Sequence, residues 1–273
     1  MSLVRAPLKT KAAFTVLCLY ALAAALGPFV IGSDGLALDL ARDLAPPGGA
    51  NGVLGRADNG VDVLTALVCG ARSSLSVCLV ATLLSALVGV FVGTIAALVG
   101  GKVDALIMRC LDVLLAFPGI LLAVYLGAIL PPSPLTVLLA LSITGWVGFA
   151  RVTRTCVAAQ LTREHVVAAR ALGASPARVV LRHVLPLALT PVIVQASFGL
   201  STAILAEASL SFLGLGVAPG TPSWGSLLDE GVAYLFVAPH LAIAPGLCIA
   251  LVVLSFNILG DALRDALDGR SAL

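Results

Sequence analysis

Six apolar runs of membrane-spanning length exclude a soluble fold for this chain. A bilayer core of roughly 30 Å is crossed by about 20 apolar residues in a helix. Hydrophobic residues make up 60% of the 273 residues and charged residues 11%, with a mean hydropathy of +1.10, which is far from the composition of soluble domains. The sequence therefore predicts an all-α membrane protein with six transmembrane helices, near residues 12–31, 75–99, 105–130, 135–150, 187–210 and 241–259.

The basic residues are distributed unevenly between the predicted loops. If the N-terminus is cytoplasmic, 12 of the 16 Lys and Arg residues fall on the cytoplasmic side, three fall outside, and Arg109 lies inside a span. An excess of Lys and Arg marks cytoplasmic loops, so we expect a multi-pass cell-membrane protein with both termini in the cytoplasm. A basic start before an apolar run is also typical of a signal peptide. The run at 12–31 is longer than a signal-peptide core and lacks a clear cleavage site, which favours a first span.

The alternation of apolar runs and polar segments predicts a single domain with four successive parts. A cytoplasmic N-terminus and the first span occupy 1–31, and an extracytoplasmic loop with a short interfacial helix at 62–72 occupies 32–74. A five-helix core at 75–262 and a cytoplasmic tail at 263–273 follow. The core contains a cytoplasmic loop at 151–186 and an extracytoplasmic loop at 213–239.

The longest polar interruption in the second half of the chain, residues 161–186, begins with the pattern of a short helix. Thr162 is a suitable N-cap, and Glu164 in the first turn complements the positive end of the helix dipole. Gly173 is a suitable left-handed stop, because glycine adopts positive φ without a steric penalty. The pattern predicts a helix that ends at this glycine.

A second helix is expected directly after the glycine, with Ser175 as N-cap and Pro176 at the first helical position, ending before Pro186. Two helices joined by a glycine turn are also typical of a DNA-reading helix-turn-helix. Here both ends are tethered to membrane-length apolar runs, which denies the second helix access to a DNA groove. We therefore expect no nucleic-acid partner and a cytoplasmic loop that docks on another protein.

Three separated motifs resemble those of a known family. The pattern A-A-x3-G-x11-L-P from Ala168 to Pro186 is similar to the "EAA" loop of binding-protein-dependent ABC importer permeases. The stretches AILAEASLSFLGLGVAPGTPSWGSLL at 203–228 and FNILGDALRDALDGR at 256–270 resemble the C-type subunit of the dipeptide, oligopeptide and nickel branch. The resemblance extends from about residue 51 to residue 270 and covers nearly the whole chain.

The resemblance implies a type I ABC importer permease fold with a cytoplasmic coupling helix. It also implies the partners: a second homologous permease, one or two ATPase subunits that bind ATP and Mg²⁺, an extracytoplasmic substrate-binding protein and the lipid bilayer. This chain would form half of the translocation pore, would bind no cofactor itself and would not be an enzyme. Dipeptides or oligopeptides are the expected cargo, with nickel or another small solute as the alternative.

The same resemblance assigns the coupling to the ATPase to the first loop helix. Val167 stands where the family usually has the glutamate of its motif, and Glu164 lies one helical turn earlier. Small side chains allow close docking, and glycine allows a turn that a bulky residue would not. The residues expected at this contact are Glu164, Val167, Ala168, Ala169, Arg170 and Gly173.

Catalytic and metal-binding patterns are missing from the sequence. There is no G-x4-G-K-[ST] phosphate loop, so we expect ATP to bind another chain. The three histidines are scattered and the six cysteines occur singly without a C-x-x-C, which indicates neither a metal site nor a disulfide framework. A gradient-driven secondary transporter, the rival reading, would carry a midplane ion site and an internal repeat. No convincing repeat is visible.

Ionisable residues inside apolar runs are candidates for special roles. Arg109 and Asp112 are three positions apart and are expected to neutralise each other on one helix. Glu207 has no cation nearby in sequence, and a lone carboxylate in hydrocarbon costs roughly 2.5–3.5 kcal/mol. It is expected either to line the pathway or its outer gate, or to be a hydrogen-bonded structural residue. In the outer loop, Trp224 and Leu227 are expected to anchor a short helix at the headgroups. The resemblance implies a second role, contact with the substrate-binding protein, and both roles can hold together.

Overall fold

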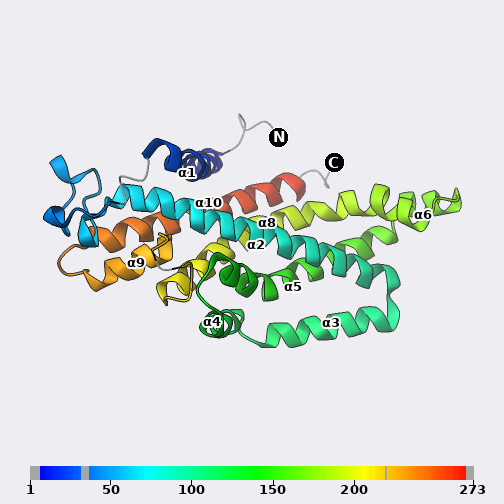
Figure 1. Cartoon of the computed structure of the whole chain (residues 1–273). Helices are drawn as coiled ribbons and strands as arrows, with labels where there is room; N and C mark the ends of the chain where they lie inside the picture. Colours follow the sequence, from blue (N-terminus) through cyan, green and yellow to red (C-terminus); the bar gives the residue numbers. More distant parts are fainter. Residues whose placement is uncertain (1–6, 32–36, 219, 269–273) are drawn as a thin grey trace. The chain divides into compact units, whose positions relative to one another are not determined.

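The computed structural model describes residues 7–31, 37–218 and 220–268, and most of them are helical (Figure 1). No strand occurs among these residues, although Arg56 and Asp62 form an isolated β-bridge. Three short 3₁₀ helices, η3 (Leu40–Arg42), η4 (Gly49–Asn51) and η5 (Asp58–Gly60), shape the segment before the second long helix. Arg5 and Arg270, which contributed to the predicted orientation, lie outside the described residues.

The predicted all-helical membrane fold is confirmed. Five stretches are long and apolar enough to cross a bilayer: α1 (Leu8–Ile31), α2 (Val63–Val99), α5 (Pro134–Leu161), α8 (Leu185–Phe212) together with the turns before it, and α10 (His240–Asp268). The sixth is a pair, α3 (Gly101–Ala116) and α4 (Gly119–Ile129), bent by 74°. Short helices complete the chain: α6 (Glu164–Ala171), α7 (Pro176–Val179), the π-helical turn η6 (Val180–Val184) and α9 (Trp224–Ala233).

The separate interfacial helix expected at 62–72 was a wrong prediction. Helix α2 begins at Val63 and continues without a break to Val99. Asp62 precedes it and accepts hydrogen bonds from the amide (2.9 Å) and hydroxyl (3.0 Å) of Thr65, as an N-cap does. Leu67 and its neighbours on this stretch are buried in protein, so the apolar stripe packs inside the molecule instead of lying on the membrane surface.

The third span is broken, not continuous as predicted for 105–130. Helix α3 stops at Ala116, and Phe117 adopts an extended conformation with φ −88° and ψ 130°. Pro118 explains the break, because a proline disfavours the helical conformation of the preceding residue and cannot donate a helical hydrogen bond. The chain resumes as α4 at Gly119 after a sharp turn.

Two other helices are longer than predicted. Helix α5 continues to Leu161, so Arg151 and Arg154 lie on a helix and not in the cytoplasmic loop expected from residue 151. Both arginines form ion pairs with carboxylates of α3. Because these pairs neutralise the charges, an otherwise apolar helix can continue through a charged segment. Helix α10 continues to Asp268, into the tail expected from residue 263.

The chain divides into two compact units, each with its own buried clusters. One unit comprises Met1–Val80, Ile120–Leu141 and Leu200–Leu259. Its larger cluster surrounds Trp224 and includes residues of α2, α8 and α10, and a smaller cluster surrounds Val137.

The other unit comprises Ala81–Gly119, Ser142–Gly199 and Gly260–Leu273. Within it, α2 and α5 approach closely because α2 presents glycines to α5. A Cβ on Gly93 would lie 2.9 Å from the Thr153 Cβ and 3.0 Å from the Arg154 amide nitrogen. Such contacts let two helix backbones pack together in a membrane protein.

Candidate functional site

The predicted coupling helix is present as α6, and local sequence determines both of its ends. Glu164 lies in its first turn and Arg170 in its last, where each charge opposes the nearer end of the helix dipole. Gly173 has φ +82°. Its amide donates to the Arg170 carbonyl at 3.0 Å, and the Ala174 amide donates to the Ala169 carbonyl at 3.1 Å. This pair of bonds is a Schellman motif, so the predicted glycine stop is confirmed.

The start of α6 differs from the prediction. Arg163 occupies the N-cap position with no side-chain hydrogen bond to the helix. The Thr162 hydroxyl, predicted to cap α6, donates backwards to the Ala159 carbonyl of α5 at 3.0 Å. Because α5 extends to Leu161, this hydroxyl lies within reach of the last turn of α5.

The second loop helix begins as predicted but does not end before Pro186. The Ser175 hydroxyl accepts from the Arg178 amide at 3.4 Å, with Pro176 at the first helical position. The chain then passes through a π-helical turn in which the Leu185 amide donates to the Val180 carbonyl, and continues into α8. Pro186 lacks an amide hydrogen, so it could not complete the regular helical ladder; the wider turn carries the chain past it without ending the helix.

One face of α6 is fixed to the neighbouring helices of its unit. Val166 is fully buried, in one cluster with Val157 of α5, Val179 of α7, Val184 of η6 and Ala188 of α8. Ala169 and Ala174 pack against this cluster from the loop. The loop therefore forms a packed hub with the end of α5 and the start of α8, and movement of α6 is coupled to both.

The other face of α6 is open and carries both apolar and charged side chains. Val167 is 55% exposed, and Glu164, Ala168, Arg170 and Gly173 are also exposed. The predicted contact residues therefore share this open face, except Ala169, which packs toward the hub. Leu172 was missed by the sequence reasoning and is 89% exposed at the end of the helix. Its position directly before the stop glycine was the available signal, because a glycine turn projects that residue away from the helix body.

The intrahelical pair predicted between Arg109 and Asp112 was wrong. Asp112 pairs with Arg151 of α5, and Asp104 pairs with Arg154 of α5, whose Nε lies 2.9 Å from the carboxylate. Arg109 forms no ion pair with any residue that the structure describes. These two bridges connect α3 to α5 within one unit. The packing of α3 against α5 therefore determines which charges pair, and the spacing of residues along α3 does not.

Glu207 is buried in a polar junction of the other unit. Its side chain is 1% exposed, and Oε1 accepts a hydrogen bond from the Ser211 hydroxyl at 2.7 Å. The Ser74 and Ser223 side chains lie beside the carboxylate, while Oε2 meets no partner with hydrogen-bond geometry among the described residues. This position favours the structural role over the gate role, since the carboxylate does not face an open path here.

Trp224 is also part of this junction, not of the surface. It is 1% exposed, its amide donates to the Ser74 hydroxyl at 3.3 Å, and its ring meets Tyr20 of α1 edge to face with centroids 5.4 Å apart. The predicted docking or headgroup role for Trp224 was therefore wrong. The side chain fills the core of its unit and does not lie at a surface. Leu227, one turn later, is partly buried.

The outer helix α9 has a strong N-terminal cap. Ser223 and Ser226 form a capping box, with the Ser226 amide donating to the Ser223 hydroxyl at 3.1 Å. Gly225 faces α8 so closely that a Cβ would lie 2.7 Å from the Ser211 Cβ. The first turn of α9 is thereby fixed against α8.

Comparison with known proteins places these features in a family. The family described as binding-protein-dependent transport system inner membrane component matches residues 89–272. A dipeptide transport system permease protein, DppC, of Alkalihalophilus pseudofirmus is 44% identical over 214 residues, which cover 78% of this chain and 70% of the relative. A di/tripeptide transport system permease protein DppC of Pseudomonas aeruginosa is 41% identical over 230 residues, 82% of this chain and 76% of the relative. The glutathione transport system permease protein GsiD of Pectobacterium atrosepticum is 42% identical over 211 residues, 77% and 69% of the two chains.

A solved structure has the same fold. A chain of the MetNI methionine ABC transporter, in an inward-facing conformation, superimposes with a TM-score of 0.62 at 18% identity, covering 75% of this chain and 97% of the other. The sequence relatives, the matched region and the apolar helices agree: the chain belongs to the family of binding-protein-dependent transport system inner membrane components and is a multi-pass membrane permease subunit of the ABC importer type.

Proposed function

We propose that this chain forms half of the pore of an ATP-driven importer of small peptides, with a second homologous permease as the other half. The relatives named for dipeptide, di/tripeptide and glutathione transport support this cargo class. An extracytoplasmic binding protein delivers the cargo, and one or two ATPase subunits bind ATP and Mg²⁺. This chain supplies the passage and the contact through which ATP hydrolysis acts on it.

The observation that carries the proposal is the two-sided character of α6. Val166 and its cluster hold one face to α5 and α8, while the other face presents Val167, Ala168 and Leu172 to a partner. Exposed apolar side chains on a short helix are the anchors by which a groove on another protein binds such a helix. A partner that grips this face moves the ends of two spans at once.

Orientation follows from the distribution of charge. Lys102 and the arginines of the loop around α6 lie on the side that we assign to the cytoplasm, whereas the stretch 214–240 has no Lys or Arg. Both termini and α6 are then cytoplasmic, and α9 is outside. This arrangement puts α6 within reach of a cytoplasmic ATPase and α9 within reach of a protein that arrives from outside.

Transport proceeds by alternating access. Closure of the nucleotide-bound ATPases draws the two coupling helices together and opens the pore toward the docked binding protein. Hydrolysis and separation of the ATPases return it to the inward-open state. Such a cycle needs only that each partner binds the two states with different affinity.

A photo-crosslinking residue placed on α6 tests the coupling contact. Val167 and Val232 are both exposed valines, on α6 and α9 respectively, so they form a matched pair. In the assembled complex, a crosslinker at position 167 should capture the ATPase with a yield that changes when ATP is added, and one at position 232 should not. Failure of position 167 to capture any ATPase would overturn the coupling assignment.

Uptake into vesicles containing the whole complex tests the cargo. Labelled di- and tripeptides should accumulate only with ATP and the binding protein present, and unlabelled peptide should compete. Accumulation of Ni²⁺ without peptide would instead assign the complex to metal import. Uptake driven by an ion gradient without ATP would contradict the importer altogether.

A further inference from the structure

Helix α3 has one face packed against protein and the opposite face uncovered. Leu111 is fully buried, in a cluster with Val147 and Ala150 of α5. On the side of the helix opposite Leu111, four exposed side chains recur at spacings of four, three and four residues, which places them in one line along the helix. We call this set the exposed stripe of α3; it consists of Lys102, Leu106, Arg109 and Val113.

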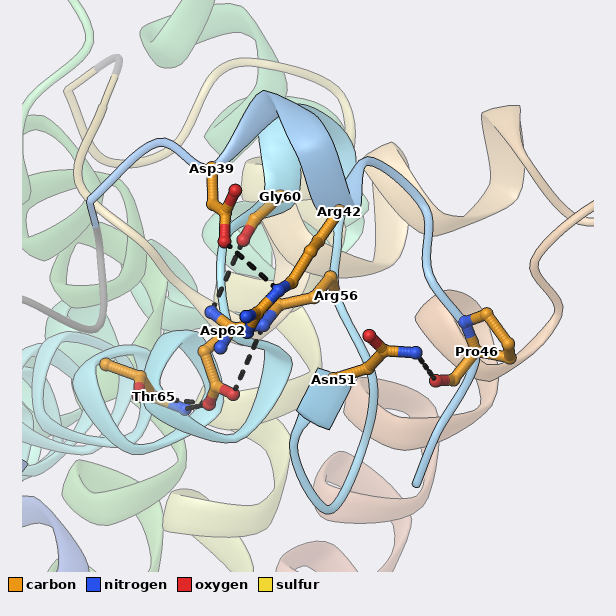
Figure 2. Close-up of polar contacts among 8 residues, drawn as sticks. All are labelled: Asp39, Arg42, Pro46, Asn51, Arg56, Gly60, Asp62 and Thr65. Atoms are coloured by element: carbon orange, nitrogen blue, oxygen red, sulfur yellow. Dashed lines mark hydrogen bonds and ion pairs between the residues drawn. The ribbon is translucent and has the colours of Figure 1, made fainter. Parts of the chain in front are cut away.

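The two cations of the stripe have no counter-ion in the part of the chain that the structure describes. Both carboxylates of α3 are occupied by arginines of α5, and neither Lys102 nor Arg109 forms an ion pair with a described residue. The segment before α2 provides a contrast, because Arg42 there pairs with Asp39 at 3.4 Å (Figure 2). The stripe therefore presents two positive charges that the described fold does not neutralise.

The depth of the stripe in the membrane follows from α5. A bilayer core of roughly 30 Å takes about 20 helical residues. Arg151 and Arg154 are 16 and 19 residues after Leu135, where the apolar run of α5 begins, so the core ends close to these arginines. They bind the two carboxylates of α3, and Arg109 lies between these carboxylates in sequence. Arg109 is therefore at the edge of the hydrocarbon core, near the depth of the lipid phosphates.

The other members of the stripe continue in both directions from Arg109. Lys102 is seven residues earlier, about 10 Å farther from the core along the helix. Leu106, between the two cations, is 64% exposed, and Val113, on the core side, is 60% exposed. Long basic side chains extend their charged heads toward the headgroups while their stems stay against apolar surface. Cations at the phosphate level with aliphatic side chains beside them match the two parts of a phospholipid.

We propose that the exposed stripe of α3 binds an anionic phospholipid, with its phosphate between Lys102 and Arg109 and an acyl chain along Val113. The orientation proposed above puts this end of α3 at the cytoplasmic leaflet, where anionic lipids attract basic side chains. A protein partner fits less well, because its carboxylates would have to be desolvated at this depth, whereas a lipid phosphate already lies there. The inference depends on neither the cargo nor the ATPase contact.

A photo-crosslinking residue in the stripe identifies the occupant. Leu106 and Leu87 are matched positions, 64% and 67% exposed, on α3 and α2 respectively. The assembled complex is placed in nanodiscs of phosphatidylglycerol and phosphatidylcholine with identical acyl chains, and the adducts are identified by mass spectrometry. The ratio of phosphatidylglycerol to phosphatidylcholine adducts should be at least about fivefold higher at position 106 than at position 87, and high salt should reduce this excess.

Charge variants in the same assay test the two cations. Lys102→Gln combined with Arg109→Gln should lower the adduct ratio at position 106 to the value at position 87. Exchanging the two cations, Lys102→Arg with Arg109→Lys, keeps both charges and should retain most of the excess. Arg109→Gln alone should lower the excess, whereas Arg42→Gln, which removes an arginine that already has an acid partner, should leave it unchanged.

Three results would overturn the proposal: equal adduct ratios at positions 106 and 87, a ratio that stays high in the doubly neutralised variant, or capture of the second permease or the ATPase at position 106. Thermal unfolding of the doubly neutralised variant in pure phosphatidylcholine nanodiscs should match that of the unmodified complex, because both side chains are exposed. A complex that enriches phosphatidylglycerol at position 106 but takes up no peptide would leave this inference intact, and only the proposed function would fail.

Discussion

The indole N–H of Trp224 donates a hydrogen bond to the main-chain carbonyl of Leu67, 3.0 Å away, and connects the first residue of α9 to α2. The two residues are 157 positions apart in sequence. The bond satisfies the one polar group of a buried tryptophan ring. The base of the outer loop is thus fixed to a span.

Trp224→Phe should destabilise the protein modestly, and Trp224→Ala strongly. Phenylalanine keeps most of the buried ring but loses the hydrogen bond, worth about 0.5–1.5 kcal/mol. Alanine also leaves a cavity, which lowers the free energy of unfolding by about 3–5 kcal/mol. Thermal unfolding of the purified protein in detergent measures both. Trp146→Phe is the control, because its indole N–H donates at 3.0 Å to the Ile143 carbonyl of its own helix; equal losses at both tryptophans would contradict the role of the connection.

Gly173→Val should uncouple ATP hydrolysis from peptide uptake. At φ +82° a β-branched residue is strongly disfavoured, so the Schellman turn rearranges and the open face of α6 moves. Uptake should fall several-fold more than ATPase activity, both measured in proteoliposomes.

Gly220 gives a matched control for that change. It has φ +81° and, like Gly173, has open space where a Cβ would be added. Gly220→Val introduces the same backbone strain in the outer loop and should leave the ratio of uptake to hydrolysis intact. A normal ratio in the Gly173→Val variant would remove the coupling role of the turn.

Leu172→Ser should weaken attachment of the ATPase by about tenfold or more. The side chain is almost fully exposed in this chain, so its burial by a partner contributes about 1.5–3 kcal/mol to binding. Copurification and titration of the ATPase with the permease measure the loss. Leu181, also exposed in the same loop region, is the control position, and Leu181→Ser should bind the ATPase normally if the contact is confined to the end of α6.

Glu207→Ala should lower stability more than Glu207→Gln. Alanine removes the acceptor of the Ser211 hydroxyl and leaves a void, which together cost about 2–4 kcal/mol. Glutamine keeps the shape and an acceptor oxygen, so its loss of stability should be about 1 kcal/mol. Peptide uptake separates the structural role from the gate role: a Glu207→Gln protein of near-normal stability should transport, and loss of uptake in that protein would restore the gate.

The sequence by itself determined the features that depend on short stretches of chain. Apolar runs predicted the membrane helices because each bilayer crossing needs about 20 such residues. The cap at Ser175 and the stop at Gly173 were predictable because their hydrogen bonds join residues within five positions. The family motifs around α6 were visible for the same reason, since their spacing is local.

Tertiary structure alone decided the partners of the charged and aromatic residues. Asp112 pairs with Arg151, 39 positions away, and not with Arg109 on its own helix, because α3 packs against α5. Trp224 and Glu207 are buried together because α2, α8 and α9 converge on them. The sequence left Glu207 open between a pathway role and a structural role, and it pointed Trp224 toward the headgroups or the substrate-binding protein. The local sequence pattern around a residue indicates which neighbouring side chains share its helix face and how polar that face is. Which atoms fill the space opposite that face depends on helices that are distant in sequence, and only the packed structure contains that information.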